Sequence, residues 1–195
     1  MIIGITGGTG CGKTTALQVI KNMGGIILDC DEIYHRLLET DPTLLSAIEA
    51  RFPNCVVDGQ LQRKVLGEIV FADKKALNDL NSITHNAVKK EVLRLLTPAP
   101  ALAAIDAIGL FEGGLAELCQ LTVAITAPTE ARIRRLMLRE NISEVYARKR
   151  IEAQKKNEEF STLCDYTLHN DGTEEDFYKE CLGFFQKWAI IKENT

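Results

Sequence analysis

The chain has 195 residues, of which 23 are basic and 27 acidic, so its formal net charge at pH 7 is -4. Apolar residues make up 46% and charged residues 26%, a composition typical of one globular domain that excludes a wholly disordered chain. The acidic balance also argues against non-specific nucleic-acid binding, because neutralising phosphates requires a basic surface.

The cysteines and the N-terminus indicate the cellular compartment. The six cysteines include no C-x-x-C pair and no histidines at zinc spacing. No basic lead-in or apolar signal segment precedes the first glycine, and no apolar run reaches the roughly 18 residues needed to span a bilayer. We therefore expect a cytoplasmic protein with reduced thiols, no membrane and no nucleic-acid partner.

Short apolar runs alternate with longer amphipathic segments, which is typical of a parallel sheet covered by helices. The pattern predicts strands at residues 2–6, 26–29, 101–108, 121–126 and 165–168. It predicts helices at residues 14–23, from Pro128 through 138, at 143–157 and at 174–191. We expect the strand at 26–29 to lie beside the strand at 2–6.

About 70 residues separate the second and third predicted strands, far more than an ordinary connection. Helix-like segments occupy residues 31–39, 44–52, 61–71 and 75–96, and Pro53-Asn54 and Asp58-Gly59 separate some of them. We interpret this region as a helical insertion that covers one side of the site.

A glycine-rich loop follows the first predicted strand and precedes the first predicted helix. Residues 7–14 read Gly-Gly-Thr-Gly-Cys-Gly-Lys-Thr and fit the pattern G-x-x-x-x-G-K-[ST]. The backbone N–H groups of such a loop and the start of the following helix bind phosphate, Lys13 reaches the β- and γ-phosphates, and Thr14 ligates Mg²⁺. The motif predicts that ATP and Mg²⁺ bind here. The nucleotide-binding residues are Gly8, Thr9, Gly10, Cys11, Gly12, Lys13, Thr14 and Thr15.

Other acidic residues lie at predicted strand ends. The chain has no N-K-x-D guanine motif, which argues against a switch GTPase. Asp106 follows a buried strand and is a second candidate Mg²⁺ ligand, or else a strand-end cap. Asp29 and Asp31 follow the strand at 26–29, where ligands of parallel sheets bind. A carboxylate there, Asp31 in particular, can accept the proton of an attacking hydroxyl, although either aspartate can instead cap the next helix.

A basic segment follows the fourth predicted strand. Residues 129–156 contain nine basic and four acidic side chains, and Arg132, Arg135 and Arg139 share one helical face. Such arginines can stabilise phosphoryl transfer when a lid closes over the phosphates, and the alternative is an ordinary solvated face. We favour Arg139 as the lid arginine, with a hinge at residues 141–143.

From residue 1 to about 185 the chain resembles the dephospho-coenzyme A kinase family. The resemblance rests on residues 4–15, 29–31 with His35, 58–66, 80–85, 106–112, the Arg135/Arg139 pair, Gln154 and residues 165–172. The family pattern has a proline where this chain has Asn86, Pro-Leu-Leu where it has Ile108-Gly109-Leu110, and a serine where it has Cys11.

The resemblance implies ATP-dependent phosphorylation of the ribose 3′-hydroxyl of dephospho-coenzyme A. It implies an α/β, three-layer P-loop kinase fold with a parallel five-stranded sheet. The expected core covers about 1–30, 99–130 and 160–195, the helical substrate insertion about 31–98 and the lid about 131–157. By resemblance the catalytic residues are Asp31, Lys13 and Arg139, and Arg135, Asn170 and Gly172 join the nucleotide site. The acceptor residues are Asp31, His35, Arg63, Asn81, His85 and Glu112.

Two other functions fit the same motifs. A related kinase could phosphorylate a nucleoside monophosphate or another small hydroxyl compound. A nucleotide-binding regulatory module could switch without catalysis, although a sensor needs no base for an acceptor hydroxyl. The sequence does not indicate an oligomeric state.

Overall fold

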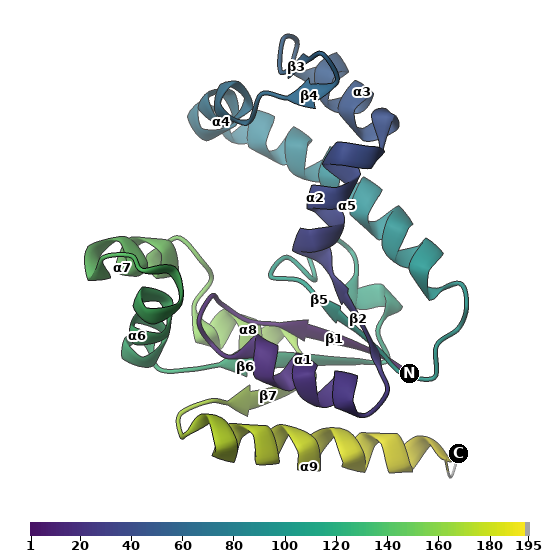
Figure 1. Cartoon of the computed structure of the whole chain (residues 1–195), viewed down its shortest axis with the longest axis vertical. Helices are drawn as coiled ribbons and strands as arrows, with labels where there is room; N and C mark the ends of the chain where they lie inside the picture. The colour runs from purple at the N-terminus through teal and green to yellow at the C-terminus, as the bar shows by residue number, and fades with distance from the viewer. Residues whose placement is uncertain (194–195) are drawn as a thin grey trace. The chain divides into compact units, whose positions relative to one another are not determined.

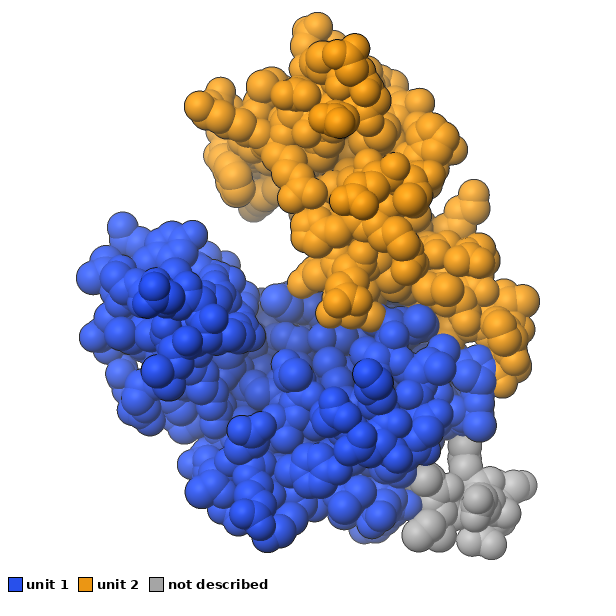
Figure 2. All heavy atoms as spheres, viewed as in Figure 1, with its two compact units in different colours: residues 1–28, 100–111, 115–195 blue, residues 29–99, 112–114 orange. Residues whose placement is uncertain are grey.

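The computed structural model describes residues 1–193, so residues 194–195 of the expected core lie outside the described residues. Two compact units divide the chain (Figure 2). Unit 1 comprises residues 1–28, 100–111 and 115–195, and unit 2 comprises residues 29–99 and 112–114. The finer division into core and lid stays a prediction.

A parallel five-stranded sheet forms the centre of unit 1, as predicted (Figure 1). Its strands are β1 (Ile2–Thr6), β2 (Ile26–Asp29), β5 (Ala103–Asp106), β6 (Leu121–Thr126) and β7 (Tyr166–His169), in the order β2-β5-β1-β6-β7. The expectation that residues 26–29 lie beside residues 2–6 is therefore wrong, because β5 lies between them. Burial explains the order: β5 is apolar and buried, whereas Ile26 of edge strand β2 is 40% exposed.

Helices cover both faces of this sheet. Helices α1 (Lys13–Asn22) and α9 (Glu174–Glu193) pack against each other and share one apolar cluster with β1 and β6. Ile3 and Ile5 enter this cluster because alternate residues of a strand face the same side. Helix α8 (Asn157–Leu163) packs against β6 (Figure 1). Its Phe160 is buried. A short 3₁₀ helix, η1 (Ala116–Leu118), precedes β6.

Helices α6 (Thr129–Glu140) and α7 (Glu144–Glu152) pack together around a small core of their own. The predicted break at 141–143 is confirmed: Asn141 has a left-handed backbone, and the Ser143 hydroxyl caps α7. The predicted single helix at 143–157 is wrong at its end. The chain leaves α7 at Ala153 and starts α8 at Asn157, and the Glu159 side chain accepts a bond from the Lys156 N–H before it.

Unit 2 is a helical cluster with one hairpin. Helices α2 (Cys30–Thr40), α3 (Pro42–Arg51) and α4 (Arg63–Ala72) each pack against the long α5 (Lys74–Leu96). Strands β3 (Val56–Val57) and β4 (Gln60–Leu61) form a hairpin, where we had expected residue 61 to begin a helix. Asp58 and Gly59 both have positive φ, which a two-residue hairpin turn requires, and Asp-Gly is a favoured pair for it. No helix in residues 1–193 is long and apolar enough to cross a membrane.

Candidate active site

The glycine-rich loop, residues 7–14, connects the central strand β1 to α1. Gly12 caps the helix with a left-handed backbone, φ 102°, and no side chain caps it. At the start of α1 the Thr15 N–H donates to the Gly12 carbonyl at 3.1 Å, whereas the Thr14 N–H has no acceptor among the described residues and is available to an anion. The Lys13 ammonium donates to the Gly7 carbonyl at 3.1 Å. The loop therefore has the geometry of a phosphate-binding site.

Two loop glycines lie so close to the side chains of Arg132 and Asn170 that a Cβ there would displace those side chains. A Cβ on Gly8 would lie 2.2 Å from a guanidinium nitrogen of Arg132, and a Cβ on Gly12 would lie 2.1 Å from the amide nitrogen of Asn170. Real Cβ atoms are not found at such distances. Gly12 also has the positive φ that other residues rarely adopt.

Arg135 and Asn170 brace the middle of the loop. Arg135 donates to the Gly10 carbonyl at 3.2 Å and to the Asn170 side-chain oxygen at 2.9 Å. Asn170, which is 4% exposed, donates in turn to the Cys11 carbonyl at 3.0 Å. The structure thus brings together these two predicted nucleotide-site residues, and both contact the loop itself. Gly172 lies beyond β7 and is exposed.

Two residues that the sequence-based site omitted also hold the loop. Arg132 and Gln154 both bind Thr9. Arg132 is only 3% exposed, contrary to the expectation of a solvated or lid-facing arginine. The periodicity of α6 puts it on the face of Arg135, and Gln154 appears only among the residues of the family resemblance. Neither the periodicity of α6 nor the family resemblance predicts which residues these two side chains contact.

Two residues near the loop have side-chain oxygens that could bind a cation. Thr14 is exposed at the start of α1, and Asp106 ends β5, paired in register with Ile5 of β1. Burial raises the pKa of the Cys11 thiol, and the charge of Asp106 adds to this shift while Lys13 and Arg132 oppose it. Cys11 is therefore a neutral thiol at pH 7, and Asp106 is close enough to act on it. A hydroxyl and a carboxylate are hard donors of the kind Mg²⁺ prefers.

Arg139 lies apart from the loop contacts. Its side chain is 57% exposed and pairs with Glu140 at 2.5 Å. Glu140 also pairs with Arg150 of α7. Hydrogen bonds from Arg139 and Arg150 lower the pKa of the Glu140 carboxyl.

In unit 2, Asp29 and Asp31 have different roles at the start of α2. The Asp29 carboxylate accepts bonds from the N–H groups of Asp31 and Glu32 at 2.9 and 3.0 Å, so it is the N-cap. The Asp31 side chain is exposed in the first turn. Of the two aspartates, only Asp31 therefore has a carboxylate that is available to bind a ligand.

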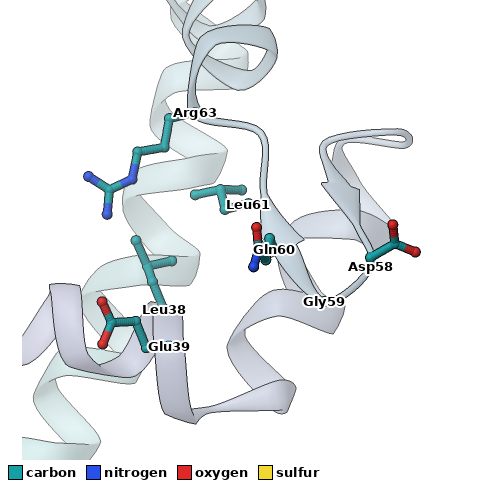
Figure 3. Close-up of a pocket in the computed structure, with 7 residues that line it drawn as sticks. All are labelled: Leu38, Glu39, Asp58, Gly59, Gln60, Leu61 and Arg63. Carbon is teal, nitrogen blue, oxygen red and sulfur yellow. The ribbon is translucent and has the colours of Figure 1, made fainter.

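Other predicted acceptor residues gather in unit 2. Arg63 of α4 lies 3.4 Å from the His35 ring of α2, and burial raises the pKa of the neighbouring Tyr34 hydroxyl against the opposing charge of Arg63. Arg63 also lines a cavity of about 490 Å³ with Leu38, Glu39 and residues 58–61. Figure 3 shows the Arg63 guanidinium and the Glu39 carboxylate on the same side of this cavity.

The remaining predicted acceptor residues are more dispersed. Asn81 and His85 lie on α5, and burial lowers the pKa of the His85 ring. His85 is consequently neutral at pH 7 and can donate or accept a hydrogen bond. Glu112 lies in the segment 112–114 of unit 2 and is exposed.

Comparison with known proteins decides the family. The family model described as dephospho-CoA kinase matches residues 1–176. The chain belongs to the dephospho-CoA kinase family. A dephospho-CoA kinase from Corynebacterium diphtheriae is 32% identical over 98% of this chain and 99% of its own length.

Solved structures agree with this membership. The structure of TT1252 from Thermus thermophilus has a TM-score of 0.79 at 30% identity and covers 96% of this chain and 97% of its own. A dephospho-CoA kinase from Campylobacter jejuni has a TM-score of 0.68 at 27% identity and covers 100% of this chain and 98% of its own. The α/β kinase fold predicted from the sequence is therefore confirmed.

Proposed function

We propose that the chain transfers the γ-phosphoryl group of ATP to the ribose 3′-hydroxyl of dephospho-coenzyme A, giving coenzyme A and ADP. Membership of the dephospho-CoA kinase family is the observation that carries this proposal. The phosphate loop supports it independently, because a glycine-rich loop that leads into an uncapped helix start, together with Lys13, suits a triphosphate.

The nucleotide side of the proposal uses unit 1. The loop N–H groups and Lys13 hold the β- and γ-phosphates, and Arg139 leaves Glu140 to pair with phosphate oxygens. Thr14 and Asp106 would hold Mg²⁺, which supplies charge neutralisation on the phosphates when bound. Arg135 and Asn170 keep the loop in position.

The acceptor side uses unit 2. Asp31 accepts the proton of the attacking hydroxyl, since its carboxylate is exposed and not used as a cap. Arg63 and His35 offer donors to the phosphates of the acceptor, and Asn81, His85 and Glu112 complete the set by resemblance to the family. The cavity beside Arg63 offers room for further acceptor groups.

A product assay tests the proposal. The full chain is incubated with Mg²⁺ and ATP plus one acceptor: dephospho-coenzyme A, CMP, AMP, pantetheine or shikimate. We expect ADP and coenzyme A to form together only with dephospho-coenzyme A. Turnover of another acceptor alone would support the alternative kinase, and ATP binding with no turnover of any acceptor would support a regulatory module.

A further inference from the structure

Thr9, in the phosphate loop, has every one of its polar groups held by side chains far along the chain. Its N–H donates to the Gln154 side-chain oxygen at 2.9 Å, and its hydroxyl accepts from the Gln154 amide at 2.6 Å. Its carbonyl accepts from Arg132 Nε at 2.9 Å. Arg132 also donates to the same Gln154 oxygen at 3.0 Å, which closes the ring of hydrogen bonds.

Arg132 is an unusual participant because it is buried as a cation. Burial lowers the pKa of its guanidinium, yet an arginine stays charged at pH 7. Within residues 1–193 its recorded partners are the Thr9 carbonyl and the Gln154 amide oxygen, and no carboxylate pairs with it. Burying a charge costs free energy. Here the hydrogen bonds of Arg132 hold Thr9, directly at its carbonyl and indirectly through Gln154.

The position of Gln154 explains why it can reach the loop. Helix α7 ends at Glu152, and the chain then runs through residues 153–156 before α8 begins. Gln154 lies in this connection, so the end of α7 is attached to Thr9 by two hydrogen bonds. The same connection replaces the continuous helix that the sequence pattern predicts.

We propose that Gln154 and Arg132 are positioning residues that hold Thr9 and so preset the phosphate loop for the nucleotide. A loop already ordered in its binding conformation loses less entropy when the phosphates bind. The proposal rests on the proposed function only in that the bound ligand is a nucleotide. Neither residue needs to touch that ligand.

The test replaces Gln154 in the full chain by the unbranched, non-hydrogen-bonding methionine. For Gln154→Met we expect the Kd for ADP, measured by calorimetry, and the KM for ATP to rise about tenfold. We expect kcat at saturating ATP to change less than about threefold, because a preset loop aids ground state and transition state alike. Amide exchange of residues 9–12 should become faster.

Gln18→Met is the matched control, because Gln18 is exposed on α1 and bonds only to the Asn22 side chain among the described residues. It should leave the Kd for ADP unchanged. Thr9→Val tests the same clamp from the loop side and should weaken ADP binding about threefold, whereas Thr9→Ser keeps the hydroxyl and should restore it. In the double variant of Gln154→Met and Thr9→Val, the loss should be smaller than the product of the single losses.

The outcomes separate this inference from the proposed function. Unchanged ADP affinity and unchanged loop exchange in Gln154→Met would overturn the inference, even if wild-type turnover of dephospho-coenzyme A is normal. If Gln154→Met does not fold, equal ADP affinities in Thr9→Val and Thr9→Ser overturn it instead. Absence of wild-type turnover with intact ADP binding would contradict the proposed function alone.

Discussion

Arg132, Arg135 and Arg139 follow one another along the same face of α6 and yet have three environments. Arg132 is buried on Thr9, Arg135 is half-buried between Gly10 and Asn170, and Arg139 is exposed beside Glu140. Arg132 and Arg135 donate hydrogen bonds to loop carbonyls, so both side chains hold the loop in place. Among the described residues Arg139 forms an ion pair with Glu140, and because such an exposed pair is worth little, the proposed pairing with a phosphate can replace it.

Lys13 is the loop residue whose loss should be most costly. Lys13→Ala removes the ammonium that would neutralise charge developing on the β- and γ-phosphates, so we expect kcat to fall below about a tenth of the wild-type value. The fold should survive, because the ammonium bonds only to the Gly7 carbonyl among the described residues. Steady-state kinetics with circular dichroism would measure both. Lys21→Ala, an exposed change on the same helix, should keep full activity, and equal activity in the two variants would contradict the role of Lys13.

Asp31 gives the corresponding test on the acceptor side. Asp31→Asn keeps the shape but removes the proton acceptor, so we expect kcat to fall about a hundredfold or more with the KM for ATP little changed. Glu32→Gln is a close control, because Glu32 is also an exposed carboxylate in the first turn of α2 and loses the same favourable helix-dipole interaction. An unchanged kcat with a raised acceptor KM in Asp31→Asn would make Asp31 a binding residue.

The sequence predicts the loop but not its supports. The spacing of Gly7, Gly12, Lys13 and Thr14 identifies a phosphate site because backbone geometry requires those residue types. Nothing local marks Gln154, since its contact with Thr9 spans 145 positions and depends on where the chain leaves α7. Arg132 was missed for a related reason: a charge-rich helix usually has a solvated face, and only the folded loop makes this arginine buried.

At the scale of elements, α6 and α7 pack together, and ion pairs connect α7 to both ends of α6. Arg148 of α7 pairs with Glu130 near the start of α6, and Arg150 pairs with Glu140 at its end. Between the helices, Asn141 turns the chain with a left-handed backbone. In the proposed pairing of Arg139 with a phosphate, Glu140 therefore still has Arg150 as a partner.

The nature of the Arg139 side chain should matter more than its charge. Arg139→Lys keeps the charge but loses the planar fork that pairs with two phosphate oxygens, so we expect kcat to fall about tenfold, and about a hundredfold in Arg139→Ala. The free energy of unfolding should stay within about 0.5 kcal/mol, as for an ordinary surface change.

Arg148→Lys is the control for Arg139, because it disturbs the ion pairs of α7 without altering the phosphate-facing candidate. We expect it to keep its kcat. Kinetics and thermal melting are measured together for the three variants. Full activity in Arg139→Ala would remove Arg139 from the site, and a large fall in melting temperature would make it structural.

The elements of unit 1 follow from the sequence more completely than their arrangement does. Buried apolar runs locate the strands because both faces of a parallel sheet are covered. The same signal cannot order the strands, because β2 reads Ile-Ile-Leu-Asp, and only the structure shows that its Ile26 is 40% exposed at the edge of the sheet. In unit 2, Asp58-Gly59 is a favoured pair for a two-residue hairpin turn, but between two helix-like segments it predicts only a break between helices.

At the scale of the whole molecule, the proposed nucleotide and acceptor residues belong to different compact units. The phosphate loop, Arg135 and Arg139 are in unit 1, whereas Asp31 and Arg63 are in unit 2. The chain passes between the units at residues 28–29, 99–100, 111–112 and 114–115. Each unit also has its own buried side chains, among them Ile5 in unit 1 and Ile48 in unit 2. Each ligand should therefore leave its own local signature.

Hydrogen exchange of the full chain can measure these signatures separately. A ligand at about a hundred times its Kd stabilises the state that binds it by about 2.7 kcal/mol, which slows the exchange of amides that open only when the ligand leaves. We expect Mg·ATP alone to slow amides 8–15 by at least about tenfold and dephospho-coenzyme A alone to slow amides at the starts of α2 and α4. Lys13→Ala should lose the first effect and keep the second, because the two sets of contacts are on different units. Slowing of the loop amides by dephospho-coenzyme A alone, with α2 and α4 unaffected, would place the acceptor on unit 1 and contradict the assignment of Asp31 and Arg63.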